Sequence, residues 1–228
     1  MSLAWTPSRA LAAHLVPAQQ IERREQRRLT TGISALDELL GGGWLRGALC
    51  EIAGSRGSGR TSVLLTSLAT ALRQGHCAAL VDGDGALDAR AAERSGVPLP
   101  RLLWVRSAQA EPAQTLAAAK IVLGAGGFTL VAVDLGDRMP QVPVASWIRL
   151  KRAAAEQQAI LLVAAPHRIP GAQGTSALGL RSLRPRFDQG KDATAPALLR
   201  GLEIYAQVER GARGPASSVL VLSHVLAR

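Results

Sequence analysis

The 228-residue sequence contains no asparagine, three lysines, two cysteines and few aromatic residues. Cys50 and Cys77 both lie in apolar stretches, which is typical of reduced core residues and argues against a disulfide framework. Aromatic residues make up only 3% of the chain, so a binding face built mainly from stacked rings is not expected. A high-GC genome is a sufficient explanation for the missing asparagine and for the preference for arginine over lysine.

The sequence also lacks a hydrophobic run long enough to cross a membrane. The longest candidate, Ala159 to Ala165, is far shorter than the roughly 20 apolar residues that a transmembrane helix needs. Pro7, Arg9 and His14 interrupt the N-terminus before the apolar segment of a signal peptide can form. We therefore expect a cytoplasmic protein without membrane contact.

The composition that is present indicates a globular, strongly basic protein. Hydrophobic residues make up 47% of the chain and charged residues 19%, which is enough apolar surface to form a buried core. The formal net charge is +10, and such a surplus favours contact with nucleic acid or another polyanion.

We interpret residues 1–29 as a basic N-terminal arm and residues 30–228 as the core domain. Two prolines punctuate the arm, and its apolar side chains fall outside any core pattern. We expect Trp5, Leu11 and Leu15 to bind another protein, because aromatic and aliphatic anchors often dominate interfaces. The alternative is a loosely packed terminus.

The core alternates short apolar runs with helical stretches, which predicts βαβ units and a mainly parallel sheet covered by helices on both faces. The expected strands are Ala48–Ala53, Cys77–Val81, Leu102–Val105, Leu130–Val133 and Ile160–Ala164. The expected helices lie near 61–74, 86–95, 113–125 and 145–158. Residues 168–176 and 187–197 are expected to be loops, and Leu202–Glu209 with Ser218–Val225 an antiparallel hairpin at the sheet edge.

A glycine-rich segment between the first expected strand and helix matches the phosphate-binding pattern G-x-x-x-x-G-K-[ST], except that Arg60 replaces the lysine. Glycines let backbone N–H groups surround an anion, and the helix N-terminus adds partial positive charge. Arg60 keeps the charge, but its planar, forked group differs in shape from an ammonium. The residues expected to bind a nucleotide are Gly54, Gly57, Gly59, Arg60, Thr61 and Ser62.

Thr31–Gly43, followed by Gly47 and Glu51–Ile52, resembles the opening of the RecA recombinase core. This resemblance covers about residues 30–225 and implies a RecA-like P-loop α/β fold. It further implies ATP and Mg²⁺ as cofactors, with Thr61 and Asp134 holding the metal ion.

The acids of the RecA pattern are present in altered form. Asp82–Asp88 resembles the segment after that family's second core strand, whose middle acid is a glutamate that activates water. Asp84 stands at that position as a vestigial water base, and its shorter side chain reaches less far. Asp134 resembles the Walker B acid. The remaining aspartates of these loops, Asp82 and Asp137 among them, are expected to cap helices or stabilise loops.

Other departures concern the γ-phosphate sensor and DNA-binding loops. Recombinases carry an Asn-Gln pair where this chain has Ala165-Pro166-His167-Arg168, and their first DNA-binding loop is reduced here to residues 136–140. We expect the large C-terminal domain of bacterial recombinases to have no counterpart. A RecA-like core with such changes resembles the ImuA family, which implies an accessory role in SOS-induced translesion synthesis. The implied partners are RecA, a Y-family-like polymerase subunit of the ImuB type and an error-prone replicative-type polymerase.

A basic segment near the C-terminal third is the candidate DNA-binding region. No acidic residue occurs between Arg168 and Phe187, and the segment resembles the location of the second recombinase DNA loop. We expect Arg168, Arg181, Arg184 and Arg186 to contact phosphates of single-stranded DNA in a salt-sensitive way. The alternative is a solvated rim beside an edge strand.

Three functions follow from these patterns. The first is a RecA-like accessory protein with a degenerate ATPase site and little or no activity. The second is an active DNA-dependent ATPase that tolerates Arg60 and Asp84. The third is an inhibitor of RecA filaments or of cell division that acts without DNA contact.

Overall fold

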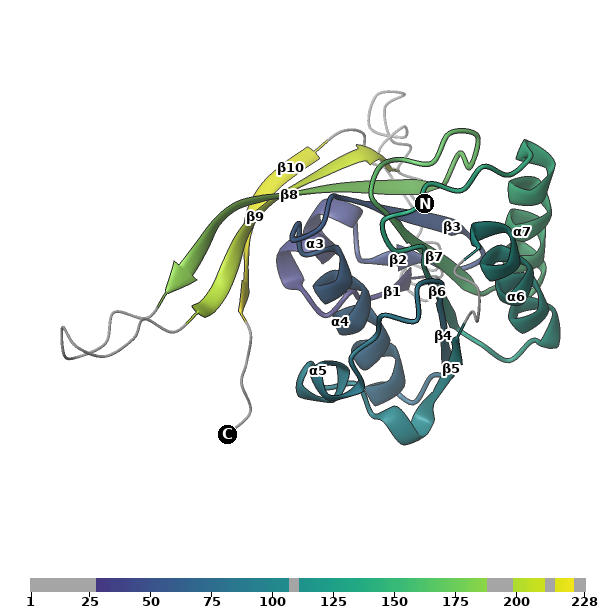
Figure 1. Cartoon of the computed structure of the whole chain (residues 1–228), viewed down its shortest axis with the longest axis horizontal. Coiled ribbons are helices and arrows are strands. Elements are labelled where there is room, and N and C mark those ends of the chain that lie inside the picture. The colour runs from purple at the N-terminus through teal and green to yellow at the C-terminus, as the bar shows by residue number, and fades with distance from the viewer. Residues whose placement is uncertain (1–27, 107–110, 188–198, 212–215, 224–228) are drawn as a thin grey trace, which may run out of the picture.

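The computed structural model describes residues 28–106, 111–187, 199–211 and 216–223 (Figure 1). The strands are β1 (Arg28–Leu29), β2 (Trp44–Leu45), β3 (Leu49–Ala53), β4 (Ala78–Asp82), β5 (Leu102–Arg106), β6 (Leu130–Asp134), β7 (Ile160–Ala165), β8 (Ser176–Phe187), β9 (Leu199–Arg210) and β10 (Ala216–Ser223). The helices are α3 (Ser34–Leu40), α4 (Arg60–Arg73), α5 (Ala89–Arg94), α6 (Pro112–Ala125) and α7 (Val144–Glu156), with a 3-10 turn, η1 (Leu99–Arg101).

The main sheet has eight strands in the order β10-β9-β8-β3-β7-β6-β4-β5. The strands from β8 to β5 are parallel to one another, whereas β9 and β10 are antiparallel to their neighbours. This topology confirms the predicted α/β class, with its mainly parallel sheet and its C-terminal antiparallel hairpin at one edge.

Helices cover both faces of the sheet, which explains why the central strands are apolar on both sides. Every residue of β3, β4 and β7 is buried. Side chains of α3, α4 and α5 belong to the core on one face, and those of α6 and α7 to the core on the other (Figure 1). Within the described part of the chain, no helix is both long and apolar enough to span a bilayer.

The five strands predicted before residue 170 lie within one residue of the observed ones at each end. The sequence pattern predicted neither α3 nor β8. Helix α3 has only seven residues and stops at Gly41, whose φ is 74°. In β8, Pro185 and the arginines break the alternation that marks a strand. Leu29 is buried, so the folded core includes the last residues of the segment that we assigned to the arm.

The strands β8, β9 and β10 extend beyond the body of the sheet as a three-stranded ribbon (Figure 1). Residues 181–187 of β8 are all exposed. The pairing register of β8 with β9 shifts between Ser182 and Arg184, so Leu183 forms a bulge. Bulges bend a strand and increase its twist, which is consistent with the curved outline of this ribbon.

Candidate functional site

The glycine-rich loop follows β3 at the carboxyl edge of the parallel strands, and α4 begins where the loop ends. Gly57 and Gly59 have φ angles of 78° and 89°, a left-handed conformation that favours glycine. Helix α4 has no side-chain cap and no acidic residue in its first turn. Its first N–H groups have no acceptor within the helix, so this end of α4 is suited to bind an anion.

Gly54 opens the loop at a point of close packing. A β-carbon at Gly54 would overlap the Ser58 hydroxyl oxygen and would lie 2.9 Å from the carbonyl oxygen of Leu180 in β8. The Ser58 hydroxyl is buried, and it has no hydrogen-bond partner within the described structure. The neighbouring strand therefore requires a glycine at position 54, whatever the loop binds.

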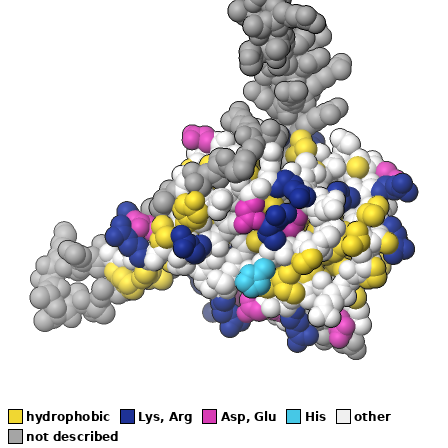
Figure 2. All heavy atoms as spheres, turned by 90° about the horizontal axis from the view of Figure 1, so that it is seen from above, with side chains coloured by type: hydrophobic (Ala, Val, Ile, Leu, Met, Phe, Trp, Pro, Cys, Tyr) yellow, Lys and Arg dark blue, Asp and Glu magenta, His cyan; other side chains and the backbone are white. Residues whose placement is uncertain are grey.

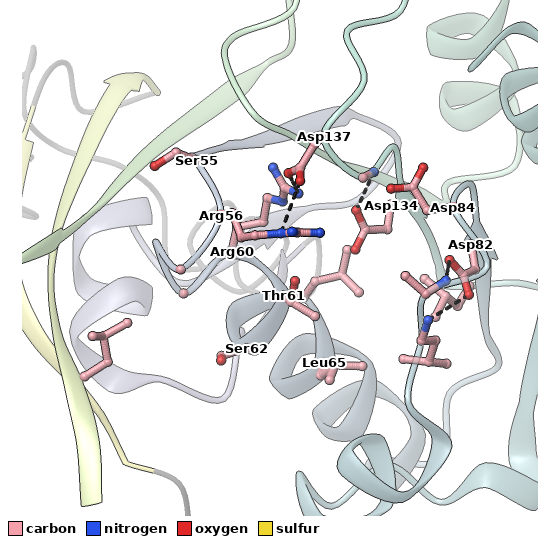
Figure 3. A pocket seen from close by; sticks show the side chains of 18 residues that line it. Ser55, Arg56, Arg60, Thr61, Ser62, Leu65, Asp82, Asp84, Asp134 and Asp137 are labelled. Atoms are coloured by element: carbon pink, nitrogen blue, oxygen red, sulfur yellow. Dashed lines mark hydrogen bonds and ion pairs between the residues drawn. The ribbon is translucent and has the colours of Figure 1, made fainter. Parts of the chain in front are cut away.

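A cleft of about 370 Å³ lies between the loop and the carboxyl ends of β4 and β6 (Figure 3). Apart from Gly54, every residue predicted to bind nucleotide lines this cleft, and so does Asp84. The fold thus brings together one loop and two acids that are far apart in the sequence.

The guanidinium group of Arg60 is held within the protein. Its Nη1 donates a hydrogen bond to the carbonyl oxygen of Gly54 at 2.8 Å, and Nη2 donates to Oδ1 of Asp137 at 3.1 Å. The other carboxylate oxygen of Asp137 lies 3.2 Å from Nε of Arg56. Arg60 is only 7% exposed. The arginine at the lysine position therefore ties the loop to the segment after β6.

Adjacent strands bring the two acids to one edge, because Asp134 ends β6 and Asp84 follows β4. Oδ1 of Asp134 accepts a hydrogen bond from the Gly136 N–H at 2.9 Å. Burial raises the pKa of Asp134, against the effects of the Gly136 hydrogen bond and of the positive charge of Arg60. Asp84 is exposed, and its carboxylate lies so close to Gly136 that a β-carbon there would overlap it.

The residues of the cleft are of the types that bind ATP and Mg²⁺. An uncapped helix N-terminus suits phosphate oxygens, and the Thr61 hydroxyl with the Asp134 carboxylate supplies the oxygen ligands that Mg²⁺ prefers. Arg60 is the exception, because its guanidinium group already forms an ion pair with Asp137.

The predicted DNA-binding arginines fall into two places. Arg168 lies in the segment between β7 and β8, where its Nε is 3.3 Å from Glu209. Arg181, Arg184 and Arg186 lie together on the exposed part of β8. The structure thus places three of the four arginines on one ribbon and one at its base.

One acid and one aromatic ring on β9 contact these ribbon arginines. Arg184 and Arg186 both bind the carboxylate of Glu203, which is 6% exposed. The hydrogen bonds from Arg184 and Arg186 lower the pKa of Glu203. The guanidinium of Arg181 lies 5.5 Å from the centre of the Tyr205 ring, a cation–π geometry. The basic segment is therefore partly neutralised by its neighbouring strand.

Comparison with known proteins identifies the family of the core. Residues 14–172 match the family model described as RecA N-terminal domain. The chain belongs to this family. It is 32% identical over 192 residues to Protein RecA of Rubrobacter xylanophilus, which is 81% of this chain and 54% of that protein. It is 38% identical over 107 residues, or 46% of this chain, to Protein RecA of Limosilactobacillus reuteri and of Desulforapulum autotrophicum, covering 29% and 30% of those proteins. The chain spans about half, or less, of the length of these relatives.

The segment matched by the RecA N-terminal domain model contains the loop, the cleft acids and Asp137, whereas β8, β9 and β10 lie beyond it. Trp5, Leu11 and Leu15, the predicted protein-binding residues of the arm, lie outside the described residues. Their role therefore stays a prediction.

Sequence reasoning missed two acidic residues that position segments of the candidate sites. Asp137 was expected only to stabilise a loop, yet it binds both loop arginines. Glu51 is 1% exposed and accepts hydrogen bonds from the backbone N–H groups of Ile169 and Gly174 at 3.2 Å and 2.9 Å. It thereby holds the segment that carries Arg168. A single acid within an otherwise apolar strand was the available signal for Glu51, whereas Asp137 had no signal of its own.

Proposed function

We propose that this RecA-family protein is an accessory factor of DNA-damage tolerance in the bacterial cytoplasm. In this proposal it promotes SOS-induced mutagenesis and translesion synthesis, as the ImuA family does. It acts through contacts with RecA and with error-prone polymerase subunits, and its ATPase site is degenerate.

The observation that carries this proposal is the position of Arg60. In a phosphate loop the basic side chain is available to the terminal phosphates, but here it donates to Gly54 and Asp137. Phosphoryl transfer depends almost entirely on positioning. A RecA-family core whose principal phosphate cation must first be released from Asp137 is therefore better suited to an adaptor than to a fast ATPase.

The end of β7 supports the same conclusion. This strand lies between β3 and β6 in the sheet, so its carboxyl end borders the region that contains the loop and Asp134. The residues there are Ala165, Pro166 and His167. Neither Ala165 nor Pro166 has a side-chain amide that could bind a γ-phosphate oxygen.

The ribbon supplies a surface for single-stranded DNA in this proposal. Arg181, Arg184 and Arg186 are exposed along one strand, and their contacts with phosphates would give binding with little sequence preference. Glu203 offsets part of their charge, so we expect weak binding that strengthens when RecA or a polymerase subunit brings the DNA close.

An active DNA-dependent ATPase is the second candidate, and the shared cleft of Thr61, Asp134 and Asp84 favours it. In that case the N-terminus of α4 would bind the phosphates, and Thr61 and Asp134 would hold Mg²⁺. The ion would supply charge neutralisation of the phosphates. Asp84 would orient or deprotonate the attacking water.

A genetic experiment separates the two candidates. Deletion of the gene should lower damage-induced mutation frequency, and the wild-type gene should restore it. Thr61→Ala changes one exposed hydroxyl, so it removes the metal ligand with little cost to folding. Restoration by Thr61→Ala supports the accessory function, whereas failure at normal protein abundance supports the ATPase. A deletion strain with unchanged mutation frequency would contradict the proposal.

A further inference from the structure

The carboxylate of Asp137 lies between the two arginines of the phosphate loop. Oδ1 is 3.1 Å from Nη2 of Arg60, and Oδ2 is 3.2 Å from Nε of Arg56. Figure 3 shows both guanidinium groups beside this carboxylate at the rim of the cleft. One internal anion therefore contacts both cationic side chains that the loop presents.

The polypeptide around Asp137 positions its carboxylate against the loop. Gly136 has a φ of 60°, a turn conformation that favours glycine, and its N–H is bound by Asp134. The side chain of Asp137 is 46% exposed, and that of Arg56 is 90% exposed. Both groups thus have room to move apart without disturbing the core.

We propose that Asp137 is an internal counter-ion that competes with phosphate for Arg56 and Arg60. A ligand with phosphate groups binds to the loop by displacing this carboxylate from the two guanidinium groups. The inference goes beyond the accessory function, because it concerns the ligand of the cleft and not the partners of the protein.

The chemistry of the contact defines the class of ligand. Guanidinium groups form strong charge-assisted hydrogen bonds to carboxylates and to phosphates alike. A phosphate chain offers more oxygens and more negative charge than one carboxylate, and it can also reach the free N–H groups at the start of α4. Di- and triphosphates are therefore expected to displace Asp137, while simple carboxylate ions are not.

The structure offers a matched control for this competition. Asp84 lines the same cleft and carries the same charge, but no ion pair joins it to a described arginine. Asp84→Asn removes one negative charge from the cleft without releasing Arg56 or Arg60. Comparing the phosphate affinities of Asp137→Asn and Asp84→Asn thus separates two effects. One is the release of Arg56 and Arg60 from their ion pairs, and the other is a general change in the electrostatic potential of the cleft.

The experiment is calorimetric titration of the full chain with inorganic pyrophosphate and, separately, with ATP, both without divalent cations. Asp137→Asn and Asp137→Ala should each raise the affinity for both ligands roughly tenfold, because two charge-assisted contacts no longer compete. Asp84→Asn should raise it less than about threefold. Equal gains for pyrophosphate and ATP would assign the effect to the phosphates and not to the nucleoside.

A second set of variants, which all carry Arg56→Ala, makes the test specific to the ion pair between Asp137 and Arg56. In a chain carrying Arg56→Ala, the gain from Asp137→Asn should shrink, because one of the two competing contacts is already absent. Circular dichroism would establish that each variant is folded.

Three results would overturn the inference. The first is an unchanged or lower affinity in folded Asp137→Asn, and the second is an equal gain in Asp84→Asn. The third is the absence of pyrophosphate and ATP binding in every folded variant. None of these results would bear on damage-induced mutagenesis, which tests the proposed function separately.

Discussion

Replacing Arg181, Arg184 and Arg186 together by alanine tests whether the ribbon binds DNA. The three side chains are exposed, so their removal should leave the fold intact, with a lower melting temperature because Glu203 loses both of its ion-pair partners. Arg184 and Arg186 share the carboxylate of Glu203. One of the three positive charges is therefore already balanced, and the cluster offers two net charges to the phosphates.

The number of net charges that contact DNA can be measured from the salt dependence of the binding affinity. For single-stranded DNA, the slope of log affinity against log salt concentration changes by about 0.7 for each phosphate contact. Two net charges predict that the triple variant loses about 1.4 from the magnitude of this slope, whereas three independent contacts would give about 2.1. Glu203→Gln releases one charge and should steepen the slope by about 0.7.

Fluorescence anisotropy of a labelled oligonucleotide over a series of salt concentrations measures the slope. The control variant replaces Arg101, Arg149 and Arg152, three exposed arginines outside the ribbon, by alanine. It lowers the net charge by the same amount but should leave the slope almost unchanged. An unchanged slope in the ribbon variant, or an equal loss in the control, would refute the assignment of DNA binding to this ribbon.

Three further predictions concern the cleft, the arm and the acid stability of the protein. ATP turnover should be near background in a coupled assay, and Arg60→Lys with Asp84→Glu should not restore full activity; turnover near one per second in the wild type would contradict this. Deletion of residues 1–20 should leave the melting temperature unchanged and weaken self-association or RecA binding, because the alternating strand and helix pattern of the sequence begins only after residue 30; sedimentation and RecA pull-down equal to full length would rule out a docking arm. Because the hydrogen bonds from Arg184 and Arg186 lower the pKa of Glu203, its stabilising contribution is complete above the unfolded value of about 4.3 and is lost as the pH falls through the folded pKa. Glu203→Gln should therefore make the melting temperature less sensitive to pH in that acidic range, and an identical profile would argue against the pairing.

The parallel half of the sheet could be predicted from the sequence because its strands are short and continuously apolar. In β7, for example, every residue is apolar and buried, so hydrophobicity alone marks the strand. The glycine-rich loop was equally clear, since its residues are consecutive and the elements on either side follow in the expected order. Local signals were sufficient in both cases.

The remaining features depend on tertiary contacts that local patterns do not record. Asp137 is 77 residues beyond Arg60 in the chain, and nothing in its sequence neighbours indicates that it pairs with two loop arginines. Glu203 binds Arg184 and Arg186 only because β8 and β9 pair in one particular register. The basic segment contains no acidic residue of its own, because the acid that pairs with its arginines lies on the next strand.

The packing of Gly54 against β8 bears on how this protein and its relatives evolve. Any side chain at this position would collide with Ser58 and with the backbone of Leu180, the residue just before β8 becomes fully exposed. The sheet itself therefore selects for this glycine, with or without a ligand. A descendant that lost every interaction with phosphate would still be expected to keep Gly54. A glycine at this position in such chains would therefore show that the loop still packs against β8. It would not show that the chain binds a nucleotide.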